Sequence, residues 1–127
     1  MPHHSRLSTR VIDCNVDDLR PALEFWSAAL GKPIADPDED GDGRYGVLAT
    51  EEDEPLILLQ KVAHESRVHL DIESDDVDAE ADRLERLGAR KIAFVKRWWV
   101  MEAPTGHRFC VVRPQRERFG RHLNAWD

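Results

Sequence analysis

Two aspartates and a histidine are the residues of this sequence best placed for chemistry. Asp13 and Asp71 occupy matching positions of two segments, VIDCNVDDL (11–19) and HLDIESDDV (69–77), which align without a gap at an offset of 58 residues. His69 stands two residues before Asp71. A histidine beside a carboxylate can act as a general base, because the acid stabilises the imidazolium. The alternative interpretations are a solvated or hydrogen-bonded histidine and aspartates that bind backbone groups or face water.

The spacing of apolar residues indicates which elements hold these side chains. Residues 11–16 and 68–73 alternate between apolar and polar, which is typical of strands with one covered face. His69 and Asp71 then lie on the face opposite to Leu70 and Ile72. Aspartates that can cap a helix follow each strand, and apolar residues recur after them at helical spacing. The pattern predicts helices near 18–30 and 76–87.

Both halves therefore predict the same β-α-β-β-β unit, as expected for an internal repeat. We expect an α+β fold of two tandem β-α-β-β-β units that form a cupped mixed sheet. The expected domain is a single one over residues 1–127, with units at about 7–62 and 66–113 and a tail at 114–127. The polar strand faces either meet water or enclose a polar-lined cleft. His3 and His4 are expected at the surface, and residues 124–127 as a frayed end or a short docking helix.

Composition and charge narrow the classes of partner. The net charge of -7 and the pI near 5.3 argue against nucleic acid and against an anionic membrane surface. No stretch approaches the roughly 18 apolar residues of a spanning helix, and the start has no secretion signal. The two cysteines, Cys14 and Cys110, lie far apart and form no CxxC motif. We expect a cytoplasmic protein with reduced thiols.

Four motifs in order resemble one protein family. They are VIDCNVDDLRPALEFWSAALG, LILLQKV, RVHLDIESDDVDAEADRLERLGA and WWVMEAPTGHRFCVV, and the resemblance covers Arg10 to Pro114. The chain is similar to the vicinal oxygen chelate superfamily, which includes glyoxalase I, bleomycin-resistance proteins and extradiol dioxygenases. It most resembles the glyoxalase-like branch common in actinobacteria. One departure is APTGH at 103–107, where that branch usually has Asp-Pro-Glu-Gly-Asn.

The resemblance also implies where a metal would bind. Metal-using members take one ligand from the first strand and one from the last strand of each unit. The matching positions here are Val11 and His69 on the first strands, and most nearly Leu58 and Cys110 on the last. Val11 and Leu58 have no donor atom, and the divalent ions of this superfamily need several nitrogen or oxygen ligands. We therefore expect that the inherited metal site is lost and that the protein has neither metal nor cofactor.

The remaining polar groups lie two residues beyond the inherited ligand positions. The predicted ligand-binding set is Asp13, Gln60, His69, Asp71, Trp98 and Cys110, and no residue is assigned a catalytic role. We expect a protein that binds a small molecule, because a cleft with apolar walls and a few polar anchors is typical of such sites. We also expect the protein to be a homodimer. An enzyme of the lyase, isomerase or dioxygenase type, using His69 with a carboxylate or a residual metal, is the alternative. A dimerisation or scaffold module is a third interpretation.

Overall fold

The computed structural model describes residues 2–36, 43–52, 54–115 and 122–127. Its contacts divide the chain into a first unit, Thr9–Val68, and a second unit, Met1–Ser8 with His69–Asp127. In chain order the elements are β1 (His3–Cys14), α1 (Arg20–Leu30), β2 (Ile34–Asp36), β3 (Tyr45–Leu48), β4 (Leu56–Lys61), β5 (Arg67–Ser74), α2 (Val77–Arg86), β6 (Arg90–Val95), β7 (Trp98–Glu102), β8 (Arg108–Val112) and β9 (Asn124–Trp126). Among the described residues, no helix is long and apolar enough to cross a membrane.

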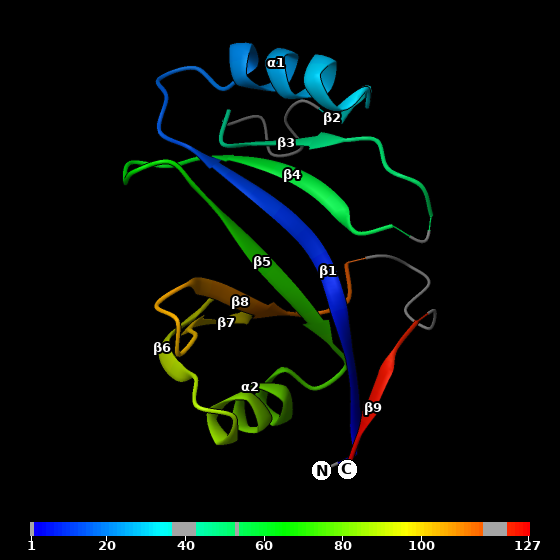
Figure 1. Cartoon of the computed structure of the whole chain (residues 1–127), viewed down its shortest axis with the longest axis vertical. Coiled ribbons are helices and arrows are strands. Elements are labelled where there is room, and N and C mark those ends of the chain that lie inside the picture. Colours follow the sequence, from blue (N-terminus) through cyan, green and yellow to red (C-terminus); the bar gives the residue numbers. More distant parts are fainter. Residues whose placement is uncertain (1, 37–42, 53, 116–121) are drawn as a thin grey trace. The chain divides into compact units, whose positions relative to one another are not determined.

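The first unit consists of four strands and one helix. Its strands follow the order β2-β3-β4-β1, with β1 parallel to β4 and the other pairs antiparallel. Helix α1 contacts β2 and β3 (Figure 1) and buries Leu23 against the sheet. The helix ends at Gly31, whose positive φ of 68° is a backbone conformation that glycine adopts without strain. Cys14, Leu48 and Leu59 complete the buried core.

The second unit has the same plan. Its strands follow the order β5-β8-β7-β6, with β5 parallel to β8, and the beginning of β1 lies beside β5. Helix α2 contacts β6, β7 and β8 (Figure 1), and its buried Ala81 packs on Met101 and Val111. Asp76 caps the helix by accepting a 3.0 Å hydrogen bond from the backbone N–H of Ala79. The predicted α+β fold of two β-α-β-β-β units with mixed strand directions is confirmed.

The chain ends differ from the prediction. Residues 124–126 are neither frayed nor helical, because they form β9 and pair antiparallel with the beginning of β1. His3 is also not at the surface, since its side chain is only 2% exposed. β1 begins at His3, well before the alternating segment at 11–16, and thereby brings the first residues of the chain into the core of the second unit.

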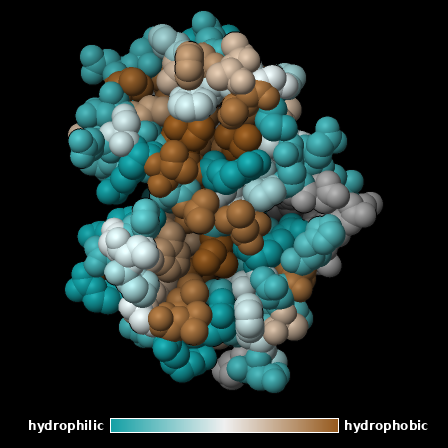
Figure 2. Space-filling model, viewed as in Figure 1, coloured by the Kyte–Doolittle hydropathy of each residue, from teal (hydrophilic) through white to brown (hydrophobic). Residues whose placement is uncertain are grey.

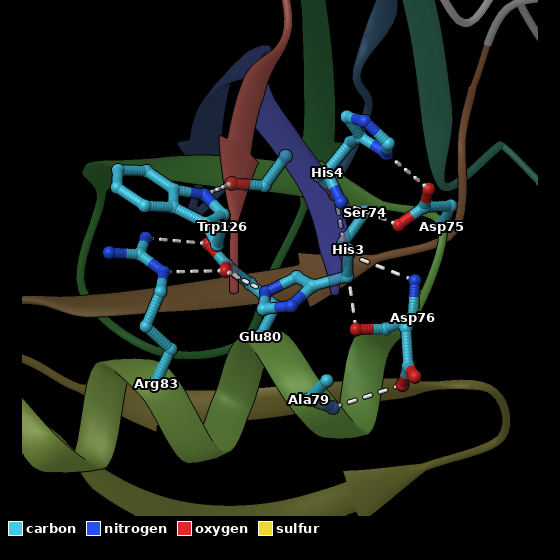
Figure 3. Close-up of polar contacts among 10 residues, drawn as sticks. His3, His4, Ser74, Asp75, Asp76, Ala79, Glu80, Arg83 and Trp126 are labelled. Atoms are coloured by element: carbon cyan, nitrogen blue, oxygen red, sulfur yellow. Dashed lines mark hydrogen bonds and ion pairs between the residues drawn. The ribbon is translucent and has the colours of Figure 1, made fainter. Parts of the chain in front are cut away.

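A buried polar network holds these ends to α2, as Figure 3 shows. The carboxylate of Glu80, fully buried, lies 2.8 Å from His3 Nε2 and accepts two hydrogen bonds of 2.8 and 2.9 Å from Arg83. The Arg83 guanidinium lies 3.8 Å from the centre of the Trp126 ring, and the indole N–H of Trp126 donates to Ser5 Oγ at 2.8 Å. The buried carboxylate of Glu80 and the buried imidazole of His3 therefore both have partners, as buried polar groups require.

Apolar side chains also reach the surface of both units, as Figure 2 shows for one face. In the second unit Leu70 is 46% exposed, because α2 contacts β6, β7 and β8. The helix therefore covers the apolar row of Val68, Leu70 and Ile72 only in part. Ile72 is partly buried, whereas Val68 and Leu70 remain largely uncovered.

Candidate functional site

The strand registers of the second unit place the predicted polar residues on one face. Asp71 pairs with Cys110, and Cys110 pairs with Val100 on the next strand. Paired residues share a face, and so do residues two apart on a strand, which adds His69 and Trp98. The opposite face carries the side chains that pack with α2, including Trp99, Met101, Phe109 and Val111. Trp98 therefore lies away from the helix, as predicted, and Trp99 toward it.

His69, Asp71 and Cys110 form a cluster on this face. Their possible ligand atoms all lie within 4.8 Å of one another, and all three residues are partly buried. His69 Nε2 lies 3.4 Å from Asp71 Oδ1, close enough for charge attraction. The two atoms are not aligned as a hydrogen bond, however, and Asp71 Oδ1 is buried without a hydrogen-bond partner among the described residues. The cluster therefore holds an acceptor oxygen that is shielded from water and not satisfied by the protein.

The neighbouring carboxylate on the same strand face is already engaged. Glu73, only 2% exposed, accepts a 2.5 Å hydrogen bond from Arg6 Nε and a 2.8 Å bond from the backbone N–H of Gln115. Both of its oxygens thus have donors, one with a formal positive charge. Glu73 fastens the beginning of β1 and the segment after β8 to β5. Asp71, by contrast, keeps its buried Oδ1 without a hydrogen-bond partner among the described residues, which makes it a candidate for binding.

The first unit brings a different polar row together. Asp13 pairs with Gln60 on β4, and Gln60 pairs with Tyr45 on β3, so these three side chains cross the sheet side by side. They lie on the face away from α1, because Cys14, Leu48 and Leu59 belong to the helix-side core. The Asp13 side chain is 2% exposed, and its Oδ2 lies 3.9 Å from Arg67 Nε. Tyr45 is absent from the predicted set, since only the pairing of β3 with β4 shows its position beside Gln60.

The same registers revise one inherited ligand position. Asp13 and Asp71 are repeat mates, and their partners across the parallel strand pair are Gln60 and Cys110. The equivalent of Cys110 in the first unit is therefore Gln60, whereas Leu58 pairs with Val11, so Leu58 and Cys110 are not equivalent positions of the repeat. Gln60 offers a donor atom, but Val11 does not. The donors that the second unit gathers, an imidazole, a carboxylate and a thiol, suit a metal of softer preference.

The two cysteines differ in their surroundings. Cys14 is buried in the core of the first unit, and its thiol lies 3.4 Å from the carbonyl oxygen of Ile12. Burial, together with the nearby charge of Asp13, raises the pKa of the Cys14 thiol. Cys110 is only partly buried and faces His69 and Asp71. Cys110 is therefore the thiol that can take part in binding, and Cys14 is a core residue.

Comparisons with known proteins agree with this architecture. Methylmalonyl-CoA epimerase from Mycobacterium tuberculosis is 21% identical, with 87% of this chain and 89% of that chain covered and a TM-score of 0.64. A methylmalonyl-CoA epimerase in complex with methylmalonyl-CoA and NH4+ is 18% identical, with 87% and 95% covered and a TM-score of 0.65. A variant of homoprotocatechuate 2,3-dioxygenase from B. fuscum is 20% identical, with 86% and 32% covered and a TM-score of 0.58.

These structural similarities, at such identities, show a common fold and not a common activity. No curated protein matches the chain. The family model described as a glyoxalase-like domain matches residues 10–112, which is most of the sequence and includes both repeats. The chain belongs to the glyoxalase-like domain family.

Proposed function

We propose that this protein binds a small organic molecule on the strand faces that lie away from the helices, and that it does so without the four-ligand metal site of its superfamily. One observation carries the proposal. Asp71 Oδ1 is buried and has no hydrogen-bond partner among the described residues, although His69 and Cys110 lie beside it. Leaving such an acceptor unsatisfied costs about 1–3 kcal/mol, which a bound partner recovers.

The surroundings of the cluster supply the apolar contact that a ligand needs. Trp98 and Val100 are partly buried on the same face of the second unit. Pockets for small molecules combine apolar walls with a few polar groups that fix orientation. We propose that His69, Asp71 and Cys110 are such polar anchors, with Trp98 as an apolar wall. Asp13 and Gln60 of the first unit remain in the proposed ligand-binding set.

Thermal shift with a panel of small ligands tests the proposal. The panel contains aromatic acids, hydroxylated compounds and acyl-CoA thioesters, the last because a structurally similar epimerase was solved with methylmalonyl-CoA. A ligand at 100 times its Kd stabilises the folded state by about 2.7 kcal/mol, which is readily measured as a rise in Tm. His69→Ala and Trp98→Ala should each reduce that rise. His64→Ala is the matched control, because His64 is exposed and its Nδ1 bonds the carbonyl of the next residue.

Two results would contradict the proposal. One is a panel in which every ligand that binds the wild type shifts the His69→Ala and Trp98→Ala variants equally. The other is a ligand whose binding is lost in His64→Ala but kept in His69→Ala. The His69→Ala and Trp98→Ala variants should both fold, since the side chains of these two residues lie on the face away from the helix-side core. Circular dichroism checks this.

The second candidate function is an enzyme of the lyase, isomerase or dioxygenase type. The distance of 3.4 Å between His69 Nε2 and Asp71 Oδ1 favours it, because a carboxylate at that distance stabilises an imidazolium formed during proton abstraction. Conversion of a ligand from the panel into a product would show that the protein is an enzyme and not only a binding protein. His69→Gln should then abolish conversion while binding persists.

We further propose that the protein is a cytoplasmic homodimer. Phe25 and Leu30 of α1 are 62% and 44% exposed, and large exposed apolar side chains that lie together are typical of protein–protein interfaces. Light scattering of the purified chain gives the mass directly. A monomeric mass at the concentrations used for ligand binding contradicts the dimer without affecting the ligand-binding proposal.

A further inference from the structure

We propose that His69, Asp71 and Cys110 form a three-ligand site for one zinc-type divalent metal inside the second unit, with Asp71 as a ligand that the superfamily pattern does not provide. We expected no metal from the sequence, because only the ligand positions implied by the family resemblance were considered as metal donors. The inference uses side chains of the proposed ligand-binding site but holds whether or not an organic ligand binds there.

The backbone positions of the three residues allow their side chains to bind one metal ion. Asp71 and Cys110 are direct partners on the parallel pair β5 and β8, and His69 lies two residues before Asp71 on the same strand face. Their side chains therefore leave adjacent backbone positions in one direction. No main-chain movement is needed to bring the three donor atoms together, since they already lie within 4.8 Å of one another.

The distances match a metal polyhedron better than a hydrogen-bonded pair. Zinc bonds to nitrogen and oxygen are about 2.1 Å long, so two such ligands at the tetrahedral angle lie about 3.4 Å apart. His69 Nε2 and Asp71 Oδ1 lie 3.4 Å apart. A hydrogen bond between them would be near 2.9 Å and aligned, but Asp71 Oδ1 has no hydrogen-bond partner among the described residues. Two donor atoms that approach without bonding each other leave room for a cation between them and Cys110.

The donor types select the metal. Thiolate and imidazole ligands suit zinc and its neighbours, whereas Mg²⁺ and Ca²⁺ prefer sites made of oxygen alone. Three protein ligands leave the fourth position of a tetrahedral ion open, as in catalytic zinc sites. Only a deprotonated Cys110 can bind the ion, so each metal that enters forms one S–metal bond and releases the thiol proton to solvent. The thiolate and the carboxylate together balance the charge of a divalent cation.

The test uses the full chain, dialysed against a chelator and then titrated with Zn²⁺ or Co²⁺. We expect one metal ion per chain by elemental analysis and about one proton released per ion in weakly buffered solution. The Co²⁺ form should show the visible bands of tetrahedral cobalt and a thiolate-to-cobalt charge-transfer band in the near ultraviolet. Cys110→Ser should abolish the charge-transfer band. Asp71→Asn should weaken Zn²⁺ binding by more than about 100-fold, since even residues that only support metal ligands contribute about 10–100-fold.

Two matched controls separate this site from general metal binding. Cys14→Ser changes the other cysteine of the chain and keeps a hydroxyl near the carbonyl of Ile12. Asp82→Asn changes an aspartate whose side chain is 54% exposed and pairs with Lys91. Both should bind Zn²⁺ as the wild type does. Thermal melts without metal show whether each variant folds. If either Asp71→Asn or Cys110→Ser does not fold, the other still tests the metal site.

Three results would overturn the inference. They are no Zn²⁺ bound at micromolar concentrations, Co²⁺ bound without a charge-transfer band, and equal Zn²⁺ affinity in Asp71→Asn and the wild type. None of them touches the proposed function, because the ligand panel is run on the metal-free protein. Conversely, a panel without any bound ligand leaves the metal titration intact.

Discussion

Replacement of Glu80 by alanine tests the buried network that fastens the chain ends. The Glu80 carboxylate is fully buried, accepts two hydrogen bonds from Arg83 and lies 2.8 Å from His3 Nε2. Its removal leaves the partly buried guanidinium of Arg83 and the buried imidazole of His3 without their acceptor, and breaking a buried ion pair typically costs about 3–5 kcal/mol. A domain of this size has a total stability of about 5–15 kcal/mol. Glu80→Ala should therefore lower the Tm by roughly 10–20 °C.

Urea denaturation followed by circular dichroism gives the change in the free energy of unfolding. The matched control is Glu24→Ala, which removes the partner of an exposed i,i+4 ion pair with Arg20 and should have little effect. A loss of less than about 1 kcal/mol in Glu80→Ala would show that the network contributes no more than a single ordinary hydrogen bond, and would refute the reasoning.

The pH dependence of the difference in unfolding free energy between the wild type and Glu80→Ala provides a second readout. Burial by itself raises the pKa of Glu80, but hydrogen bonds from Arg83, His3 and Ser5 and the charge of Arg83 outweigh it, so the pKa lies below its usual value. A carboxyl with a lowered pKa in the folded state stabilises the protein above its unfolded pKa of about 4.3 and loses that contribution as pH falls through the folded value. The stability gap between wild type and Glu80→Ala should be largest near neutral pH and shrink in acid.

Three further predictions concern single sites. Iodoacetamide should alkylate Cys110 in the native protein and Cys14 only after unfolding, because burial raises the pKa of Cys14; peptide mass spectrometry locates the label, and native labelling of Cys14 would contradict this. Gly46→Ala should destabilise by about 1–3 kcal/mol in urea denaturation, because a Cβ there would lie 2.5 Å from a methyl group of buried Leu23; in a Leu23→Ala background the same substitution should cost less, and equal costs would exclude the clash. Asp76→Ala should cost about 1 kcal/mol in a thermal melt through loss of the α2 cap, and an unchanged Tm would mean that water replaces the cap.

Local sequence patterns predicted the elements well because local physics determines them. The apolar spacing predicted helices near 18–30 and 76–87, and the structure has them at 20–30 and 77–86. Asp75 or Asp76 was expected to cap the second helix, and Asp76 does so. The first helix differs, since its N-cap residue is Leu19, and Asp18 instead accepts a 3.0 Å hydrogen bond from the N–H of Arg20. Alternating residues also predicted correctly which side of β5 carries His69 and Asp71.

Contacts between distant residues were not predictable from such patterns. His3 and Glu80 are 77 positions apart, and Ser5 and Trp126 are 121 apart. A histidine near a chain end next to polar residues has no local signature of burial, and a three-residue strand is too short to show alternation. Tyr45 illustrates the same limit, because its place beside Gln60 depends on the register of two strands and not on its own neighbours.

The internal repeat explains why the two units present different chemistry on equivalent strands. Asp13 and Asp71 keep the same residue type, but their cross-strand partners are Gln60 in the first unit and Cys110 in the second. The first row buries its aspartate with Oδ2 3.9 Å from Arg67 Nε, and Asp13 Oδ1 is also buried without a hydrogen-bond partner among the described residues. The second row places its aspartate beside a histidine and a thiol, with one oxygen unsatisfied. The two rows thus differ in the groups beside the aspartate, and only the second unit gathers three possible metal-ligating side chains among the described residues, which is why the proposals for ligand and metal both centre on the second unit.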